Sequence, residues 1–377
     1  MKRALLLALL LSGASGGDAG AATRAEPALA QTLAQIRLPP GFHISLYAKV
    51  PGARALAVGA HGTVFVGTRG DQVYAVAPDG SVRPFAPDVA KQDPNGVCLA
   101  PDGTLYVVER TRITAYADAE SAQPKPRLVT DSLVPAALVG NGHDARVCRV
   151  GPQGRIYVAV GQPYNVPPPA RWPALSAAGL GAILRLNPDG SGREVFASGI
   201  RNSVGLDFSP RDGALWFTDN QVDGMGDDIP PGEINRADRP GENFGFPYYG
   251  GGRVRTVAFA DRTPPAGLVF PVMETVAHAA DLGMVFYRGS AFPPAYRGAI
   301  FSAQHGSWNR SVPVGARVMV TIFRPDGSVA ESRPFAEGWN TPEGYRGRPV
   351  DVAERADGSL LVSDDQAGAL YRITYAP

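Results

Sequence analysis

A short unit, a tight turn followed by an apolar strand, recurs along this chain and constrains its fold more than any other feature. Copies read PDGTLYV at residues 101–107, PQGRIYV at 152–158 and RDGALWF at 211–217. Each joins Asp-Gly or a similar turn to β-branched and aromatic residues, a pattern typical of β-hairpins. Together with copies at residues 62–67 and 356–362 and a weaker one at 297–302, the turn glycines are Gly62, Gly103, Gly154, Gly213, Gly298 and Gly358.

The spacing of these glycines indicates the architecture. Successive turn glycines lie 41, 51, 59, 85 and 60 residues apart. Units of this size match the blades of a β-propeller, each a four-stranded sheet set around a common axis. A β-helix would repeat at a shorter period, and a pair of β-sandwiches would not need a period. We therefore predict an all-β fold, a single six-bladed β-propeller over residues 36–377.

Glycine and proline are abundant, with 45 and 35 of the 377 residues, and both disfavour helix interiors. A helical bundle is therefore excluded, while 44% hydrophobic and 19% charged residues exclude general disorder. The 36 Lys and Arg residues balance 35 Asp and Glu residues without a basic block. Nucleic acid is therefore not an expected partner.

The first residues have the pattern of a secretory signal. Lys2 and Arg3 precede an apolar run at residues 4–11, and candidate A-x-A cleavage sites follow at 19–21 and 28–30. We predict that residues 1–30 are a signal peptide with a short linker, and that the protein is periplasmic or secreted. The apolar run is too short to span a bilayer, so no transmembrane segment is expected in the mature protein.

The two cysteines, Cys98 and Cys148, lie inside apolar runs and lack metal-ligand spacing. Their neighbours, such as Val97 and Val147, are typical of buried strands. We interpret both cysteines as small core residues, in preference to a disulfide.

Polar residues stand at one position of the repeat, at the start of the strand that leads into each turn. Asn95, His143, Asn202 and Arg348 lie 8, 11, 11 and 10 residues before their turn glycines. If that strand lines the central channel, these side chains converge at one mouth of it. Imidazole, guanidinium and amide groups together suit an anionic ligand and proton transfer, with His143 as the candidate general base.

A segment rich in carboxylates and glycine, residues 218–228, follows the fourth turn. Its oxygen atoms suit Ca²⁺, although the spacing is not that of an EF-hand. A solvated acidic loop explains the composition equally well, and the sequence leaves both interpretations open.

Six motifs, in this order, resemble the glucose/sorbosone dehydrogenase family, and most closely its sorbosone dehydrogenase-like branch. They are LPPGF at 38–42, GIRN at 199–202, DDIPPGEINR at 227–236, NFGFP at 243–247, HGSWNRS at 305–311 and GRPVDV at 347–352. The resemblance implies a six-bladed propeller, in agreement with the count of turns. It also implies the cofactors pyrroloquinoline quinone (PQQ) and Ca²⁺.

The resemblance implies roles for residues around the quinone. His143 matches the family's general base. The residues implied to bind the cofactor are the quinone-contacting pair Arg201 and Asn202, the carboxylate-holding Arg346 and Arg348, and His305 in place of a family lysine.

The resemblance also implies ligands for calcium. Backbone carbonyls that bind the metal at the quinone fall at Gln221 and Val222, where glucose-specific members have Gly-Pro. A further calcium site would use Asp227, Asp228 and Glu233. Gln162 stands where glucose-specific members have an acid that orients the histidine, and we expect its side chain to be able to take over that hydrogen bond.

The sequence therefore predicts a PQQ- and Ca²⁺-dependent oxidoreductase. We expect its substrate to be an aldose sugar or a sorbosone-like aldehyde, with a cytochrome or the quinone pool among the candidate electron acceptors. Two alternatives stay open, a Ca²⁺-dependent sugar-lactone hydrolase and a non-catalytic binding propeller. Neither alternative requires a histidine base surrounded by arginines.

Overall fold

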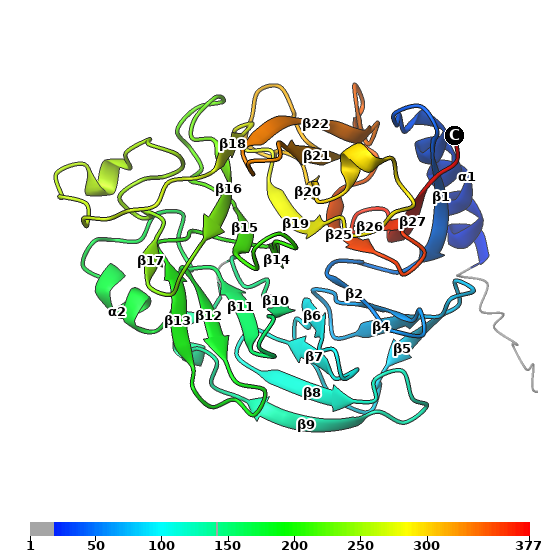
Figure 1. The fold of residues 1–377 in the computed structure, drawn as a ribbon, viewed down its shortest axis with the longest axis horizontal. Helices are drawn as coiled ribbons and strands as arrows, with labels where there is room; N and C mark the ends of the chain where they lie inside the picture. The colour runs from blue at the N-terminus through cyan, green and yellow to red at the C-terminus, as the bar shows by residue number, and fades with distance from the viewer. Residues whose placement is uncertain (1–18, 141) are drawn as a thin grey trace, which may run out of the picture.

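Six small sheets are arranged around a central axis (Figure 1), which confirms the predicted six-bladed β-propeller. The structure is a computed structural model that describes residues 19–140 and 142–377. The four antiparallel strands of blades 1 to 5 follow one another along the chain. Blade 3 gains β17 from the excursion that follows β16, and blade 6 takes its outermost strand from the N-terminal side.

The first three blades carry the N-terminal half of the chain. Blade 1 consists of β2 (Leu56–Val58), β3 (Val64–Val66), β4 (Val73–Val76) and β5 (Val82–Phe85). Blade 2 consists of β6 (Gly96–Leu99), β7 (Leu105–Val108), β8 (Ile113–Ala117) and β9 (Lys125–Thr130). Blade 3 consists of β10 (Val147–Val150), β11 (Ile156–Val160), β12 (Ala182–Leu186) and β13 (Glu194–Ser198), extended by the short parallel strand β17 (Glu242–Asn243).

The other three blades complete the ring. Blade 4 consists of β14 (Leu206–Phe208), β15 (Leu215–Asp219), β16 (Gly232–Ala237) and β18 (Met273–Thr275). Blade 5 consists of β19 (Asp281–Phe286), β20 (Ile300–Gln304), β21 (Arg317–Phe323) and β22 (Val329–Glu337). Blade 6 consists of β25 (Pro349–Glu354), β26 (Leu360–Asp364), β27 (Ala369–Tyr375) and β1 (Phe42–Lys49).

Short elements precede β1 or lie in the connections between strands. They are the helices α1 (Ala19–Gln35) and α2 (Trp172–Ala177), the 3₁₀ turns η1 (Ala136–Leu138), η2 (Val257–Phe259) and η3 (Pro294–Tyr296), and the hairpin β23 (Asn340–Thr341) with β24 (Gly344–Tyr345).

The predicted turns join the first two strands of every blade. All six turn glycines have φ between +72° and +88°, a conformation that is strained for a residue with a Cβ atom. Each turn is therefore a fixed corner that sends the innermost strand back as the second strand. The long spacing between the fourth and fifth turns reflects the excursion between β16 and β18.

The ring is closed by the two ends of the described chain. Strand β1 pairs antiparallel with β27, with Ile44 opposite Ile373, and the two run side by side in Figure 1. Phe42 inserts between blades 5 and 6, where its ring centroid lies 4.8 Å from that of Phe292 and 4.9 Å from that of Phe335. The last blade is therefore built from both ends of the propeller chain, which ties the ring closed.

The prediction of two separate buried cysteines was wrong, because Cys98 and Cys148 form a disulfide. Both are buried, on the innermost strands β6 and β10 of neighbouring blades. They stand 5 and 6 residues before their turn glycines, so the repeat brings them side by side with Cα atoms 5.7 Å apart. That separation is in the usual range for disulfides.

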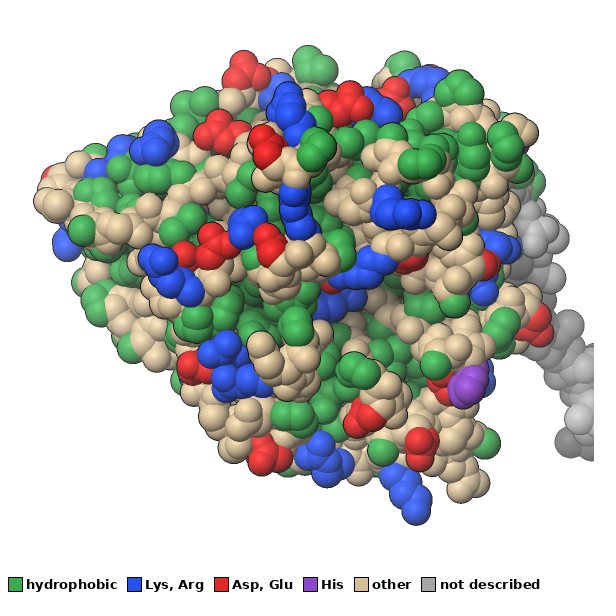
Figure 2. All heavy atoms as spheres, in the orientation of Figure 1, with side chains coloured by type: hydrophobic (Ala, Val, Ile, Leu, Met, Phe, Trp, Pro, Cys, Tyr) green, Lys and Arg blue, Asp and Glu red, His purple; other side chains and the backbone are tan. Residues whose placement is uncertain are grey.

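The predicted signal peptide falls largely on residues 1–18, which lie outside the described residues. Helix α1 covers the end of the predicted signal and linker, and its Leu29 is buried in the cluster between blades 5 and 6. None of the helices in the described ranges has the length and hydropathy of a membrane span. On the face drawn in Figure 2, acidic and basic side chains are interspersed around a central hollow.

Candidate active site

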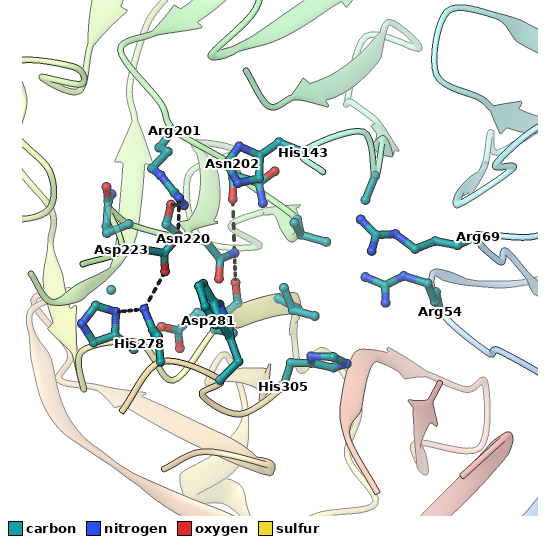
Figure 3. A pocket seen from close by; sticks show the side chains of 18 residues that line it. Arg54, Arg69, His143, Arg201, Asn202, Asn220, Asp223, His278, Asp281 and His305 are labelled. Atoms are coloured by element: carbon teal, nitrogen blue, oxygen red, sulfur yellow. Dashed lines mark hydrogen bonds and ion pairs between the residues drawn. The ribbon is translucent and has the colours of Figure 1, made fainter. Parts of the chain in front are cut away.

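A polar pocket of about 250 Å³ lies where the innermost strands begin. Its charged and polar walls come from blades 1, 3, 4 and 5 or the loops beside their strands (Figure 3). They are Arg54, Arg69, His143, Arg201, Asn202, Asn220, Gln221, Asp223, His278, Asp281, His305 and Asn309. The predicted residues His143, Arg201, Asn202, Gln221 and His305 are therefore brought together at one mouth of the channel.

His143 is held in a defined orientation just before β10. Its Nδ1 lies 2.6 Å from the backbone carbonyl oxygen of Gln162. Because a carbonyl only accepts, Nδ1 carries the proton and the neutral ring keeps an unprotonated Nε2. Burial, and secondarily the charge of Arg201, lowers the pKa of His143 to about 4, so the ring is neutral near pH 7.

The expectation that the Gln162 side chain orients the histidine is not met. That side chain closes its own loop instead: Nε2 donates to the carbonyl oxygen of Tyr164, and Oε1 accepts from the Tyr164 N–H at 3.0 Å. The backbone of Gln162 holds His143 in place of the side chain. A neutral carbonyl fixes the tautomer but adds no negative charge to raise the basicity of the ring.

Arg201 is buried and its guanidinium is fixed by three neighbours. Nη2 lies 2.8 Å from Oδ2 of Asp223 and 2.9 Å from Oδ1 of Asn165, and Nη1 donates to the carbonyl of Asn220 at 3.0 Å. The backbone N–H groups of Arg201 and Asn202 donate to the buried carboxylate of Asp219. Burial raises the pKa of Asp219 to about 6, although these donors oppose the shift.

Two arginines in the pocket, Arg54 and Arg69, were missed by the sequence analysis. Figure 3 shows their guanidinium groups pointing into the pocket from the side opposite Arg201. Arg54 is buried, with Nε 2.7 Å from Oδ1 of Asn95 and Nη1 on the carboxylate of Asp365. A signal existed, because Arg54 lies 8 residues before Gly62, the same offset as Asn95 from its own turn glycine.

His305 lies in the pocket and forms a pair with an acid that was also missed. Its Nε2 lies 2.8 Å from Oδ1 of Asp365, the carboxylate that also binds Arg54. Burial lowers the pKa of His305, while Asp365 opposes the shift. The pair therefore links the β20–β21 loop to the end of β26.

Arg346 and Arg348 do not line the pocket. Arg348 donates from Nε to the carbonyl of His305 at 3.0 Å and from Nη2 to that of Gly306 at 2.6 Å, so its guanidinium supports the turn behind His305. Arg346 lies 3.6 Å from the carboxylate of Glu343. Neither placement brings a free guanidinium to a ligand in the pocket.

Gln221 and Val222 lie in the loop between β15 and β16. Gln221 lines the pocket, and Val222 is buried, with its N–H donating to the carbonyl of Gly250 at 3.0 Å. Within the described residues, neither carbonyl oxygen accepts a hydrogen bond. Both carbonyl oxygens are therefore open to a hard cation, with Gln221 at the pocket wall and Val222 next to it in the chain.

Asp227, Asp228 and Glu233 are not assembled into one metal site. Asp227 accepts from the N–H of Ser311 at 3.1 Å, and the exposed Asp228 lies 3.3 Å from Arg310. Glu233 is buried, where it accepts from the Gly252 N–H at 2.7 Å, and burial next to Asp219 raises the pKa of Glu233 to about 8. Across residues 19–140 and 142–377, no three His, Cys, Asp or Glu side chains group so as to hold a metal.

A further network, not expected from the sequence, joins the loops over blades 4 and 5. Nε2 of His278 donates to the carbonyl of Gly226 at 2.8 Å, which leaves Nδ1 to accept from Nδ2 of Asn309. Asn309 also donates to Asp223 at 2.8 Å, and Asp223 binds Arg201. The loop that contains Gln221 and the loop that contains Asn309 are thereby fixed to each other around the pocket.

The family model of glucose and sorbosone dehydrogenases matches residues 54–372. The chain belongs to this family. A Borreliella burgdorferi protein, described as uncharacterized, is 31% identical over 354 residues, covering 90% of this chain and 91% of that one. The family and the pocket together identify a sugar dehydrogenase-type oxidoreductase.

Solved structures share the fold of this glucose/sorbosone dehydrogenase family member at low identity. The holo form of the PQQ domain of Coprinopsis cinerea pyranose dehydrogenase has a TM-score of 0.74 at 19% identity, covering 90% of this chain and 97% of that chain. A calcium structure of a Trichoderma reesei Carbohydrate-Active Enzymes Family AA12 protein has a TM-score of 0.75 at 18% identity, covering 91% and 97%. At these identities the likeness establishes the propeller fold.

Proposed function

We propose that this family member is a PQQ- and Ca²⁺-dependent dehydrogenase that oxidises an aldose sugar or a sorbosone-like aldehyde, with His143 as general base. The observation that carries the proposal is the orientation of His143. Its Nδ1 is committed to a carbonyl, its neutral Nε2 is free, and the ring lies in a pocket lined by three arginines. The PQQ domain and the calcium structure among the similar folds support both groups.

The pocket fits a polycarboxylated quinone. Arg54 and Arg69 present positive charge from blade 1, and within the described ranges the one hydrogen bond of the Arg69 side chain goes to the carbonyl of Gly142, at 3.1 Å. The buried Oδ1 of Asn202 has no hydrogen-bond partner among the described residues, and leaving such an atom unsatisfied costs about 1–3 kcal/mol. We assign Arg54, Arg69, Arg201 and Asn202 to the cofactor, and Arg348 to support of the His305 turn.

The loop between β15 and β16 offers oxygen ligands that suit Ca²⁺. The carbonyl oxygens of Gln221 and Val222 are uncommitted within the described residues, and the buried Oε1 of Gln221 also lacks a partner. Oxygen atoms from a backbone loop are the ligands that Ca²⁺ prefers. We assign the metal to these carbonyls and do not extend the assignment to Asp227 and Asp228, which bind the β20–β21 loop instead.

The chain's own residues would prepare the substrate for oxidation. Nε2 of His143 would take the proton from the hydroxyl at the anomeric carbon of a sugar, or from an aldehyde hydrate. Arg201 cannot swing away, because Asp223, Asn165 and Asn220 fix its guanidinium, so its charge stays beside the reacting group. PQQ, when bound with Ca²⁺, supplies the electrophile that accepts the hydride.

We also propose that the protein works after export. The disulfide between Cys98 and Cys148 supports this, because such bonds persist in oxidising compartments. The signal-like residues 1–30 would direct that export.

Reconstitution tests the proposed function directly. Purified protein would be titrated with PQQ in the presence of CaCl₂, followed by absorbance and calorimetry, and then assayed for dye reduction with aldoses and small aldehydes. We expect PQQ binding, sugar-dependent dye reduction, and loss of activity on treatment with a calcium chelator that added CaCl₂ reverses. Absence of PQQ binding would refute the proposal and favour a lactonase or a binding propeller.

A further inference from the structure

An exposed tryptophan stands at the mouth of the pocket. Trp308, in the loop between β20 and β21, lines the pocket while 76% of its surface is exposed. Among the described residues it takes part in no aromatic pair and no cation–π contact, in contrast to Trp172, Trp216 and Trp339. A ligand in the pocket could cover this indole, and the gain would scale with the apolar area removed from water.

The backbone on both sides of Trp308 is held firmly. On one side, the buried Ser307 has its hydroxyl 3.1 Å from that of Tyr345 and accepts from the Val314 N–H at 3.0 Å. On the other side, Asn309 donates to Asp223 at 2.8 Å. The indole therefore projects from a braced loop, so its exposure is not the result of a loose segment.

The chemistry of the pocket defines what the indole can cover. Polar groups such as His143, Arg201 and Asn202 line the same pocket and are suited to hydroxyls and to the cofactor. A flat aromatic surface in a pocket with polar walls matches a ligand with one apolar face and hydroxyl groups around it. A ring-closed sugar has such a face, formed by its C–H bonds, whereas an open-chain aldehyde does not.

We propose that Trp308 is the platform on which the C–H face of a ring-closed sugar stacks, and that it selects pyranoses over open-chain aldehydes. This proposal rests on the proposed function, because it takes the sugar to lie above the cofactor with its anomeric carbon toward His143. The cofactor itself is the competing occupant of the indole face. We favour the sugar because Trp308 is exposed, whereas Arg201 and Asn202, assigned to the cofactor, lie deeper.

The test compares Trp308→Ala with Trp308→Phe in protein reconstituted with PQQ and CaCl₂. For D-glucose and D-galactose, Trp308→Ala should raise KM about tenfold with little change in kcat, in line with the typical energy of an aromatic contact. Trp308→Phe should recover most of the affinity. KM for glyceraldehyde should stay unchanged in both variants.

Val312→Ala is the matched control. Val312 lies in the same loop and is 67% exposed, but it does not line the pocket. Its truncation should leave every KM unchanged. A Val312→Ala effect equal to that of Trp308→Ala would overturn the proposal, because it would mean that loop perturbation is enough.

A binding measurement separates this proposal from the proposed function. Methyl β-D-glucopyranoside, which lacks a free anomeric hydroxyl, should protect Trp308 fluorescence from iodide quenching, and sorbitol should not. Protection without any sugar oxidation would support Trp308 while refuting the dehydrogenase assignment. Weaker PQQ binding by Trp308→Ala with unchanged sugar KM, or no protection by the glucoside, would overturn the stacking role.

Discussion

The innermost strand of each blade has a turn end, at the recurring turn glycine, and a pocket end, and the two ends differ in how much they vary between blades. At the turn end the same hydrogen bond recurs: Oδ1 of Asp102, Asp212 and Asp357 each accepts a hydrogen bond from the backbone N–H two residues later. At the pocket end the blades that line the pocket present different polar residues, from Arg54 beside blade 1 to His143 beside blade 3. The repeated end sets the spacing of the blades, and the varied end carries the chemistry.

The difference extends to the satisfaction of polar atoms. The turn aspartates have their acceptors engaged, and their exposed loops need no special partner. At the pocket end, Asn202, Gln221 and Asn309 each hold a buried oxygen without a hydrogen-bond partner among the described residues, and other such atoms, for example Nε of Arg155 and Nε1 of Trp216, lie elsewhere in the blades. Unsatisfied buried polar atoms are uncommon in folded proteins, so the three oxygens at the pocket end are available to a bound ligand.

Replacing His143 with Ala should have the largest effect of any change at the pocket end. Loss of a general base typically lowers turnover by about 10²–10⁴-fold. PQQ affinity and the melting temperature should change little, which titration and thermal unfolding would check. His61→Ala, at the turn end, is the matched control and should be fully active, and a fully active His143→Ala would remove His143 from the mechanism.

The fold was predictable because it depends on the repeated end. Turn chemistry and strand composition are local, and six copies of the same signal fixed the number of blades. The closure of blade 6 by β1 was not predictable in this way, since Phe42–Lys49 carries no turn of the repeat. Its place depends on pairing with β27, at the far end of the chain.

The site was predictable only where a polar residue had a recognisable offset or motif. His143, Arg201 and Asn202 met that condition, and Arg54 met it but was overlooked. Asp365 could not be found in this way, because its contact with His305 depends on how the end of β26 approaches the β20–β21 loop.

The disulfide joins blades 2 and 3 midway between the turn end and the pocket end of their innermost strands. Removing it tests how much the stability of these two blades depends on their covalent link. The double variant Cys98→Ala/Cys148→Ala should lower the free energy of unfolding by about 2–4 kcal/mol, because the bond closes a long loop. Denaturant titration with and without a reducing agent measures this. Unchanged stability in both experiments would show that strand packing alone holds blades 2 and 3 together.

Replacing Arg69 with Gln tests whether PQQ is held by Arg69, as the structure suggests, or by Arg346, as the family resemblance implies. Losing a charge-assisted hydrogen bond typically costs about 1.5–3 kcal/mol, so PQQ affinity should fall roughly 10- to 100-fold. Arg346→Gln should leave the affinity unchanged, because Arg346 does not line the pocket. Calorimetric titration of both variants decides, and the reverse result would restore the assignment made from sequence.

The pH dependence of kcat/KM tests how strongly the surroundings of His143 at the pocket end lower its pKa. The pKa of His143 is lowered to about 4 by burial and by Arg201, and the base acts only when neutral. Activity should therefore stay level as the pH falls from 7 to about 5, and drop about tenfold per unit below 4. A break near 6.5, the ordinary value for histidine, would contradict this environment. Circular dichroism at each pH would separate titration from acid unfolding.

The smallest effect is expected at the turn end, from Gly213→Ala. Gly213 has φ +74° and a Cβ atom there would meet nothing within 4 Å, so the cost is backbone strain alone, about 1 kcal/mol. Its neighbour in blade 4, Gly205, offers the contrast, since a Cβ there would lie 2.1 Å from the carbonyl oxygen of Leu282. Gly213→Ala should lower the melting temperature slightly and leave kcat and KM for the sugar unchanged. A change in either kinetic constant would show that strain at the turn reaches the pocket, and that the two ends do not act independently.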